Sequence, residues 1–399
     1  MIDVAIIGGG PAGVAAALQL KARGVEHVAI LEREAELGGV PRHCGHPPFG
    51  LREFGRILAG PAYAKRLSAA AEAAGAKILT RHSVVRLNPG GVLDVATPDG
   101  MQELRALRVL LATGARETPR SARLIGGDRP LGVLNTGALQ AHIYLQETTP
   151  FRRPVVVGTE LVSLSALATC RRHGIRPVAM LEAGRRLVAR RPFSLFPRLL
   201  RIPLHYGAEI EEICGNARVE SVRLRDGREI ECDGVLLTGK FVPESTLARM
   251  GHLAVDSGSN GPVVDQYGRC SDSAYFAAGN VLRGIETAGW SFREGTAIAD
   301  YIADDLCGGL PGADNAVEII CGEGLKYAVP QSLARVSKLR GLMQLRVVEP
   351  ARGQLRVRAG DNVLYRTWVS ALPERRVLLD LEQIRLPQDV SQITVELVP

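Results

Sequence analysis

The sequence predicts an α/β protein made of two nested βαβ units and a small C-terminal β domain. An apolar strand at the start of the chain runs into the glycine-rich segment GGGPAG at residues 8–13. A second strand and turn begin at Pro154, and this second unit closes near Gly239. After Pro311 the pattern changes to short alternating strands separated by Gly and Pro turns, which is typical of a β-sandwich-like domain.

The first glycine-rich segment has the spacing of a dinucleotide-binding turn. Gly8 makes the tight turn, Gly10 lets the backbone approach a pyrophosphate, and Gly13 lets the following helix pack close to the strand. Glu32 comes about twenty residues later, where an acid accepts hydrogen bonds from ribose hydroxyls. The helix N-terminus offers free N–H groups to the phosphates. The other predicted contacts of this site are Pro11, Ala12 and Arg33.

Length, composition and charge indicate the number of domains and argue against a nucleic-acid partner or a membrane span. A chain of 399 residues with 46% hydrophobic residues suggests two or three domains with sizeable cores. The net charge of +7 is compatible with a nucleic-acid partner, but no basic tract interleaved with aromatic residues supports one. We therefore expect scattered surface arginines and no nucleic acid. The apolar run at residues 4–20 contains four glycines and a proline, so we expect no transmembrane segment.

The seven cysteines are scattered, and no two of them have C-x-x-C spacing. The spacings of zinc and iron–sulfur ligands are absent from the sequence, so we expect no metal site within the chain. Scattered single cysteines are typical of a reducing compartment, which predicts a cytoplasmic protein.

Two further strand ends complete the pattern. The apolar strand at residues 109–111 ends in Ala112-Thr113-Gly114, and the strand at residues 275–278 ends in Gly279-Asn280. Together with the first turn, these motifs resemble the two-dinucleotide-binding-domain flavoproteins of the pyridine nucleotide–disulfide oxidoreductase superfamily. The resemblance covers residues 1–308. It implies a three-layer, Rossmann-like FAD-binding domain at residues 1–120 and 240–310 and an inserted NAD(P)-like domain at residues 121–239. The alternating strands after Pro311 predict a small β domain at residues 315–399.

Segments at residues 38–46, 60–64, 112–117, 126–130, 136–140 and 326–331 resemble a narrower group. This group comprises flavoprotein subunits of glycerol-3-phosphate-type, hydrogen-cyanide-synthase-type and opine- or proline-type dehydrogenases. The resemblance implies a heteromeric partner that carries a second flavin or an iron–sulfur centre. It also implies that the N-terminus of the helix beginning at Ala288 faces the flavin and stabilises negative charge on the reduced ring. The further cofactor contacts that it implies are Gly39, Val40, Arg42, Val84, Thr113, Gly114, Gly279, Asn280 and Ala288.

The chain departs from this superfamily at its redox dithiol. Only Cys44 follows the Gly38-Gly39 turn, whereas disulfide reduction requires an attacking and a resolving thiol. Two interpretations of Cys44 remain open. With His43 and His46 beside it, it is a candidate catalytic thiol of lowered pKa, with His43 as its partner. Alternatively, it is a cysteine packed in a loop.

The inserted unit has an altered glycine fingerprint. Glu160 and Ser163 stand where the second and third glycines are expected, although Glu182 remains at the ribose position. A carboxylate close to a pyrophosphate is unfavourable in a partly dry site. We therefore expect doubtful NAD(P)H use, with NADH preferred over NADPH if any binding survives. Asn280 also replaces the usual Asp, and its amide oxygen still accepts a hydrogen bond from a ribityl hydroxyl.

These expectations favour an FAD-dependent oxidoreductase that is the electron-transferring subunit of a multisubunit dehydrogenase. Its substrate would be a small amine, amino acid or hydroxy compound. One alternative is a stand-alone NADH-dependent flavin reductase of a protein or dye acceptor. Another is an assembly subunit whose FAD is redox-silent. The C-terminal β domain is expected either to dock a partner subunit or to brace a homodimer.

Overall fold

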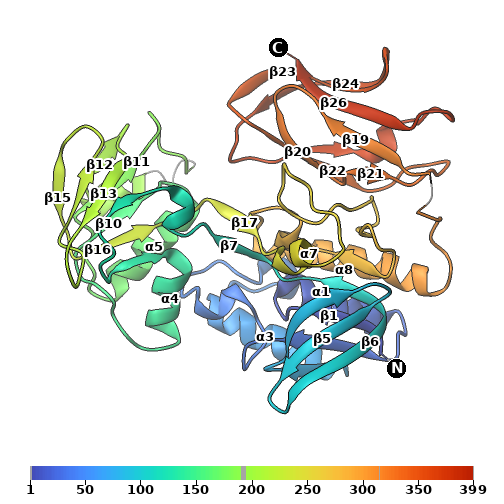
Figure 1. The fold of residues 1–399 in the computed structure, drawn as a ribbon, viewed down its shortest axis with the longest axis horizontal. Helices are drawn as coiled ribbons and strands as arrows, with labels where there is room; N and C mark the ends of the chain where they lie inside the picture. The colour runs from blue at the N-terminus through green and yellow to red at the C-terminus, as the bar shows by residue number, and fades with distance from the viewer. Residues whose placement is uncertain (1, 190–194, 314, 399) are drawn as a thin grey trace. The chain divides into compact units, whose positions relative to one another are not determined.

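The computed structural model describes residues 2–189, 195–313 and 315–398. Residues 1, 190–194 and 399, which fall inside the predicted domain ranges, lie outside this description. The chain forms two compact units (Figure 1). The first comprises Met1–Gly39, Arg66–Ala115 and Val242–Pro399, and the second comprises Val40–Lys65 and Arg116–Phe241. Residues 40–65 are thus part of the second unit, although the predicted boundaries placed them with the first.

The first unit contains a parallel sheet that carries the glycine turn. Its strand order is β3-β2-β1-β6, and β18 pairs with the free side of β6. Residues 4–7 of β1 and 28–31 of β2 are unbroken apolar, buried runs, as expected for a parallel sheet covered on both faces. The long strand β6 also joins an antiparallel meander with β5 and β4. These strands are β1 (Ile2–Ile7), β2 (Val28–Glu32), β3 (Lys77–Thr80), β4 (Ser83–Asn88), β5 (Val92–Thr97), β6 (Gly100–Leu111) and β18 (Tyr275–Ala277).

Two helices of this unit pack directly on one another. They are α1 (Pro11–Ala22) and α8 (Ala288–Leu306). Seven residues of α1 are buried, and these include a run of small alanines that lets other backbone come close. Gly295 of α8 lies against the Ala12 carbonyl of α1, because a Cβ at Gly295 would overlap that oxygen. Helix α8 begins at the N-cap Thr287, whose side chain accepts a hydrogen bond from the backbone N–H of Trp290.

The second unit repeats the parallel βαβ arrangement. Its sheet has the order β12-β11-β10-β16-β9, and every pairing in it is parallel. Helix α5 follows β10, as α1 follows β1, and α4 precedes β10. A smaller sheet has the order β15-β14-β13-β8. These elements are β8 (Gly126–Gly127), β9 (Val133–Asn135), α4 (Thr136–Tyr144), β10 (Pro154–Val157), α5 (Leu161–Arg172), β11 (Ala179–Glu182), β12 (Leu204–Tyr206), β13 (Ile210–Cys214), β14 (Ser221–Leu224), β15 (Glu229–Glu231) and β16 (Gly234–Leu237).

The C-terminal residues form two facing sheets within the first unit (Figure 1). The larger has the order β21-β19-β26-β23-β24 and the smaller has the order β20-β22-β25. Alternate residues such as Leu355, Val357, Ile393 and Val395 are buried in a common core, which confirms the expected β-sandwich-like fold. The strands are β19 (Val317–Cys321), β20 (Leu325–Val329), β21 (Ser332–Leu333), β22 (Leu342–Val347), β23 (Ala351–Ala359), β24 (Asn362–Ala371), β25 (Val377–Asp380) and β26 (Gln392–Val398).

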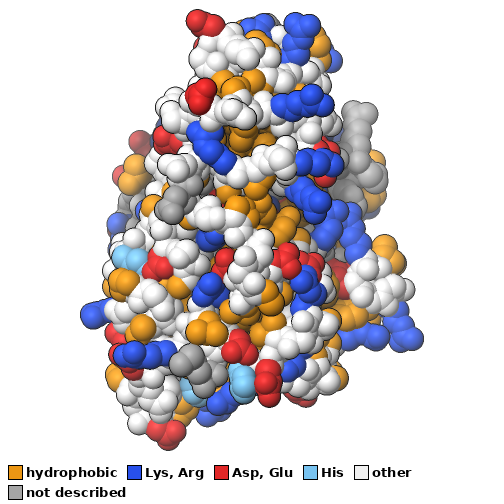
Figure 2. Space-filling model, turned by 90° about the vertical axis from the view of Figure 1, so that its right-hand side faces the viewer, with side chains coloured by type: hydrophobic (Ala, Val, Ile, Leu, Met, Phe, Trp, Pro, Cys, Tyr) orange, Lys and Arg blue, Asp and Glu red, His pale blue; other side chains and the backbone are white. Residues whose placement is uncertain are grey.

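Shorter elements connect these sheets and helices. They are α2 (Leu51–Phe54), α3 (Gly60–Ala73), β7 (Ala115–Glu117), α6 (Phe196–Leu199), β17 (Phe241–Pro243), α7 (Thr246–Met250) and the 3-10 turns at Val40–His43, Ser121–Arg123, Gly279–Val281 and Leu381–Gln383. Among the described residues, every helix is too short or too polar to cross a membrane. Figure 2 shows one face of the molecule, on which Lys and Arg side chains are spread among Asp and Glu side chains.

Candidate functional site

The packing of the protein itself requires two glycines here, one in the turn between β1 and α1 and one in the first turn of α1. Gly8 has a φ of +109°, and a Cβ there would lie 2.5 Å from the Ala112 carbonyl oxygen, just beyond the end of β6. A Cβ at Gly13 would overlap the Gly8 carbonyl oxygen. Both glycines are therefore explained by the close packing of helix, turn and strand.

Gly10 is different, because nothing in the described protein requires a glycine there. Its φ of −79° and ψ of −173° are open to any residue. The nearest atom to an added Cβ is the Gly39 Cα, at 3.9 Å. The backbone at the N-terminus of α1 is thus left clear, and Gly10 provides no side-chain cap for the helix. This open backbone fits a pyrophosphate bound at the helix N-terminus.

Glu32 lies beside the same turn, at the end of β2. Its side chain is buried, and one carboxylate oxygen accepts a hydrogen bond from the Gly9 N–H at 2.9 Å. The other oxygen accepts one from the Glu34 N–H at 3.0 Å. These two bonds orient the carboxylate next to the turn, where a ribose contact is predicted. The neighbouring Arg33 is exposed and lies 3.7 Å from Glu34.

The residues that follow β6 are hydrogen-bonded to Glu244, close to Val242, where the chain re-enters the first unit. The Thr113 hydroxyl donates a hydrogen bond to the Glu244 carbonyl at 2.7 Å. The Gly114 carbonyl accepts one from the Glu244 N–H at 2.8 Å, and Gly114 has a φ of +76°. Thr113 and Gly114 thus join the segment that follows β6 to the segment around Glu244. Val84, in β4, packs against the core of the same unit.

The third motif lies between β18 and α8. Gly279 has a φ of +81°, and a Cβ there would lie 2.9 Å from Ala12 Cβ, so this turn sits directly on α1. The Asn280 amide oxygen accepts a hydrogen bond from the Glu286 N–H at 2.7 Å, and its amide N–H donates to the Glu286 carbonyl at 3.2 Å. Asn280 therefore closes the loop that leads to Ala288, the first residue of α8. An amide oxygen has a second lone pair, which leaves the predicted ribityl contact chemically available.

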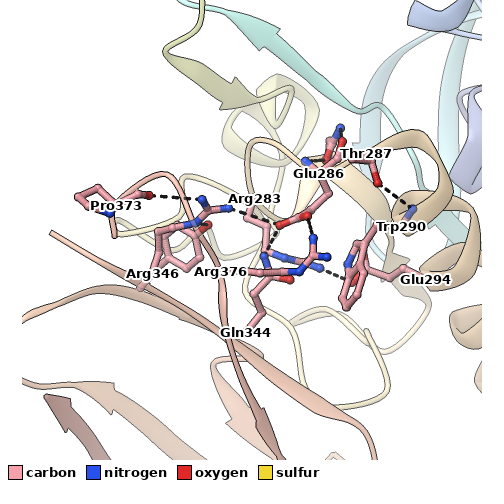
Figure 3. A network of polar contacts seen from close by, with 11 residues as sticks. Arg283, Glu286, Thr287, Trp290, Glu294, Gln344, Arg346, Pro373 and Arg376 are labelled. Atoms are coloured by element: carbon pink, nitrogen blue, oxygen red, sulfur yellow. Dashed lines mark hydrogen bonds and ion pairs between the residues drawn. The ribbon is translucent and has the colours of Figure 1, made fainter. Parts of the chain in front are cut away.

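A network of buried and partly exposed charged groups adjoins this loop, and no sequence motif marks it (Figure 3). The Glu286 carboxylate accepts hydrogen bonds from Gln344, from Arg376 and, at 3.4 Å, from Arg346. Arg283 is 2% exposed and pairs with Glu294. Because Gln344, Arg346 and Arg376 lie about sixty to ninety positions after Glu286, no short motif relates them.

The corresponding turn of the second unit is filled by its own side chain. Glu160 is the N-cap residue of α5, with a φ of −76° and a ψ of 176°, which is nearly the conformation of Gly10 at α1. An added Cβ at Gly239 would lie 2.5 Å from one Glu160 carboxylate oxygen, and one at Gly158 would lie 2.7 Å from the other. The carboxylate therefore lies within the turn. Burial raises the pKa of Glu160, which favours its neutral form.

Ser163, which replaces the third glycine of this fingerprint, and Glu182, at the ribose position, both form hydrogen bonds to nearby residues. The Ser163 hydroxyl is fully buried and donates to the Glu160 carbonyl at 2.6 Å. Glu182 accepts hydrogen bonds from the Thr159 hydroxyl and, at 2.8 Å, from the Gly184 N–H. These polar groups of the second turn thus find their partners within the chain.

Cys44 lies in the second unit, directly after the 3-10 turn Val40–His43. Its thiol contacts the Gln140 side-chain oxygen at 3.5 Å, and a Cβ at Gly60 would overlap the Cys44 carbonyl. Burial, with the nearby negative charge of Glu117, raises the pKa of Cys44 to about 12. This direction is opposite to the lowered pKa expected of a catalytic thiol, because desolvation and the Glu117 carboxylate both disfavour the thiolate.

The predicted site residues divide between the two units. Val40, Arg42, His43 and Cys44 belong to the second unit. The first unit brings together the turn at residues 8–13, Glu32, Thr113-Gly114 and Gly279-Asn280, through the contacts described above.

Thiol labelling tests the environment of Cys44. At pH 8 a thiol of pKa about 12 holds on the order of one thiolate in ten thousand, so we expect Cys44 to resist iodoacetamide. Cys307 is exposed and serves as the internal control. Peptide mass spectrometry after brief labelling of the native protein measures both sites. Equal labelling of Cys44 and Cys307 would contradict the raised pKa of the Cys44 thiol.

Similarity to known proteins agrees with this geometry. Residues 2–295 match the family described as pyridine nucleotide-disulphide oxidoreductase. The ferredoxin--NAD(+) reductase subunit of a benzene 1,2-dioxygenase system from Pseudomonas putida is 28% identical over 319 residues, which is 75% of this chain and 74% of that protein. An opine oxidase subunit from Rhizobium meliloti (strain 1021) is 26% identical over 399 residues, which is 90% of this chain and 85% of that protein.

A solved structure shares the fold. L-proline dehydrogenase from P. horikoshii superposes with a TM-score of 0.60 at 24% identity, over 77% of this chain and 56% of that chain. The glycine turns, the nested parallel sheets and the family match lead to one conclusion. This chain belongs to the pyridine nucleotide-disulphide oxidoreductase family and is an FAD-dependent oxidoreductase.

Proposed function

We propose that this protein is the electron-transferring flavoprotein subunit of a multisubunit dehydrogenase, with FAD held by the first unit. Gly10 carries the proposal, because neither its backbone conformation nor the surrounding protein explains a glycine there. FAD supplies the redox chemistry when it is bound. The chain supplies an open helix N-terminus for the pyrophosphate at residues 10–13 and an oriented carboxylate, Glu32, for the ribose.

The second unit supports a role in which electrons do not come from a nicotinamide nucleotide. The Glu160 side chain fills the place where the pyrophosphate of a second dinucleotide would meet the backbone. The disulfide route is also unsupported, because Cys44 has a raised pKa and no resolving cysteine at the required spacing. The electrons would then enter or leave at the flavin through a small molecule or another subunit.

The similar protein from Rhizobium meliloti is named as one subunit of an opine oxidase, which supports a heteromeric assembly for this chain. We propose that the partner carries a second flavin or an iron–sulfur centre. We propose a small amine, amino acid or hydroxy compound as the substrate class, as the resemblance to these dehydrogenase subunits implies. A homodimer is the other assembly that the C-terminal β domain would serve. We propose the cytoplasm as the compartment, on the pattern of scattered cysteines.

The second candidate function is a stand-alone NADH-dependent reductase of a protein acceptor. It is favoured by the similarity to a ferredoxin--NAD(+) reductase component of a dioxygenase system. Glu182 also remains at the ribose position of the second turn.

The FAD site is tested by Gly10→Val. We expect this variant to fold but to lose visible flavin absorbance, because its side chain points into space that the protein leaves open for the pyrophosphate. Gly137→Ala is the matched control, since an added Cβ there lies 3.6 Å from its nearest neighbour and outside the proposed site. Circular dichroism measures folding, and absorbance after dialysis against FAD measures binding. Full flavin content in Gly10→Val would contradict the assignment.

The state of the second turn is tested by flavin reduction with NADH in a stopped-flow instrument. We expect slow, non-saturating reduction of the wild-type protein and faster, saturable reduction of Glu160→Gly. Glu160→Gln keeps the volume of the side chain but removes its ability to carry a negative charge, so it shows which of the two blocks NADH. Because burial already favours the neutral form of Glu160, we expect Glu160→Gln to behave like the wild type. Rapid reduction of the wild-type protein at micromolar NADH would instead favour the reductase function.

The multisubunit assignment is tested by affinity purification from the native host, followed by size-exclusion chromatography. We expect substrate-dependent dye reduction to elute with a complex that contains a second, cofactor-bearing chain. The same chain produced alone is the control, and we expect it to bind FAD without dehydrogenase activity. An active species that contains only this chain would refute the proposal.

A further inference from the structure

We propose that the C-terminal β domain forms part of the flavin site, where its arginines favour the reduced state of the flavin. This inference rests on the proposed FAD site, and it assigns to Arg376 and Glu286 a role that no motif predicted. The residues act through the loop that precedes α8 and through their charge, so we call them positioning and electrostatic residues.

Glu286 is the point at which the β domain meets this loop (Figure 3). Its side chain is 5% exposed. One carboxylate oxygen accepts hydrogen bonds from Gln344 and Arg346, which lie on β22, and the other accepts from Arg376, which immediately precedes β25. All three donors therefore come from the smaller sheet of the β domain or its edge.

The same residue is bound by its backbone to the predicted ribityl motif. Its N–H and carbonyl both bond to the Asn280 amide, and the next residue, Thr287, is the N-cap of α8. The Arg376 guanidinium also lies over the Trp290 ring in the first turn of α8, at 3.8 Å from the ring centroid. A change in the β domain is thus transmitted directly to the end of α8 where the flavin ring is expected.

The charges of the network do not balance. Three guanidinium groups, those of Arg283, Arg346 and Arg376, face two carboxylates, those of Glu286 and Glu294. Arg283 is 2% exposed, and its Nε and Nη1 have no hydrogen-bond partner in the part of the chain that the structure describes. The excess is positive and adjoins the positive end of the α8 dipole.

This excess predicts a redox effect. A hydride transferred from a donor to FAD carries two electrons and one proton, so the reduced flavin gains one negative charge while the donor is oxidised. The Arg283 and Arg346 side chains are 2% and 11% exposed and that of Arg376 is 30% exposed. Positive charge that is largely shielded from water stabilises a reduced flavin more strongly than it would in water. The arginines of the β domain should therefore raise the midpoint potential of the bound flavin.

The test compares variants of opposite charge change in the full-length FAD-loaded protein. Arg376→Gln removes a positive charge and should lower the midpoint potential, whereas Glu286→Gln removes a negative charge and should raise it. We expect each shift to reach a tenfold change in the equilibrium between oxidised and reduced flavin, which is about 30 mV for a two-electron couple. Arg376→Lys keeps the charge and should stay close to the wild type. Equilibration with a reference dye during slow reduction measures the potential.

Lys338→Gln is the matched control, because Lys338 also lies in the β domain and forms an exposed pair with Glu382 at 2.7 Å. We expect no shift from it. Shifts of the same sign in Arg376→Gln and Glu286→Gln, or shifts no larger than that of the control, would overturn the proposal while leaving the FAD site intact. If Glu286→Gln does not fold, the comparison of Arg376→Gln with Arg376→Lys decides, and equal potentials in those two would overturn it. A wild-type protein that binds no FAD would refute the proposed function and this inference together.

Discussion

The contact between α1 and α8 is the constraint on which the first unit depends. These helices come from opposite ends of the flavoprotein part of the chain, yet Gly295 of α8 meets the Ala12 carbonyl of α1 with no side chain between them. Gly279 packs on the Ala12 side chain at the same place. Because neither contact leaves room for a larger residue, the glycine turn at the start of α1 and the loop before α8 are held side by side. A cofactor that reaches from one to the other requires this arrangement.

The two nucleotide units show how one residue changes the chemistry of a shared backbone shape. Gly10 and Glu160 are N-cap residues with almost the same φ and ψ, so the backbone has the same local conformation with either residue. The difference lies in the space above the turn. In the first unit that space is open, and in the second unit it holds a carboxylate whose burial raises its pKa. The same scaffold thus presents an open surface in one unit and a self-filled turn in the other.

The buried network around Glu286 is costly to form, because charged groups lose hydration when they leave water. Its presence is more readily explained by a function than by stability, since buried ion pairs are weak contributors to folding free energy. Tying a separate β domain to the N-terminus of α8 is such a function. The network would let the β domain act on the flavin without supplying any residue of the dinucleotide fingerprint.

Local pattern alone determined the α/β class, the first glycine turn with its acid, the nested second unit and the β-sandwich-like C-terminal domain. These features follow from hydrophobic periodicity and glycine spacing, which act over short stretches of chain. The same reasoning selected Glu160 as the residue that alters the second turn, and its side chain does fill that turn. It did not decide between the two interpretations of Cys44, because a thiol's pKa depends on the burial and charge that surrounding segments impose. Nor did it find the partners of Glu286, which are about sixty to ninety residues away in sequence. The surroundings of Cys44 and of Glu286 come only from the tertiary structure, because segments distant in sequence meet solely through the packing of each unit.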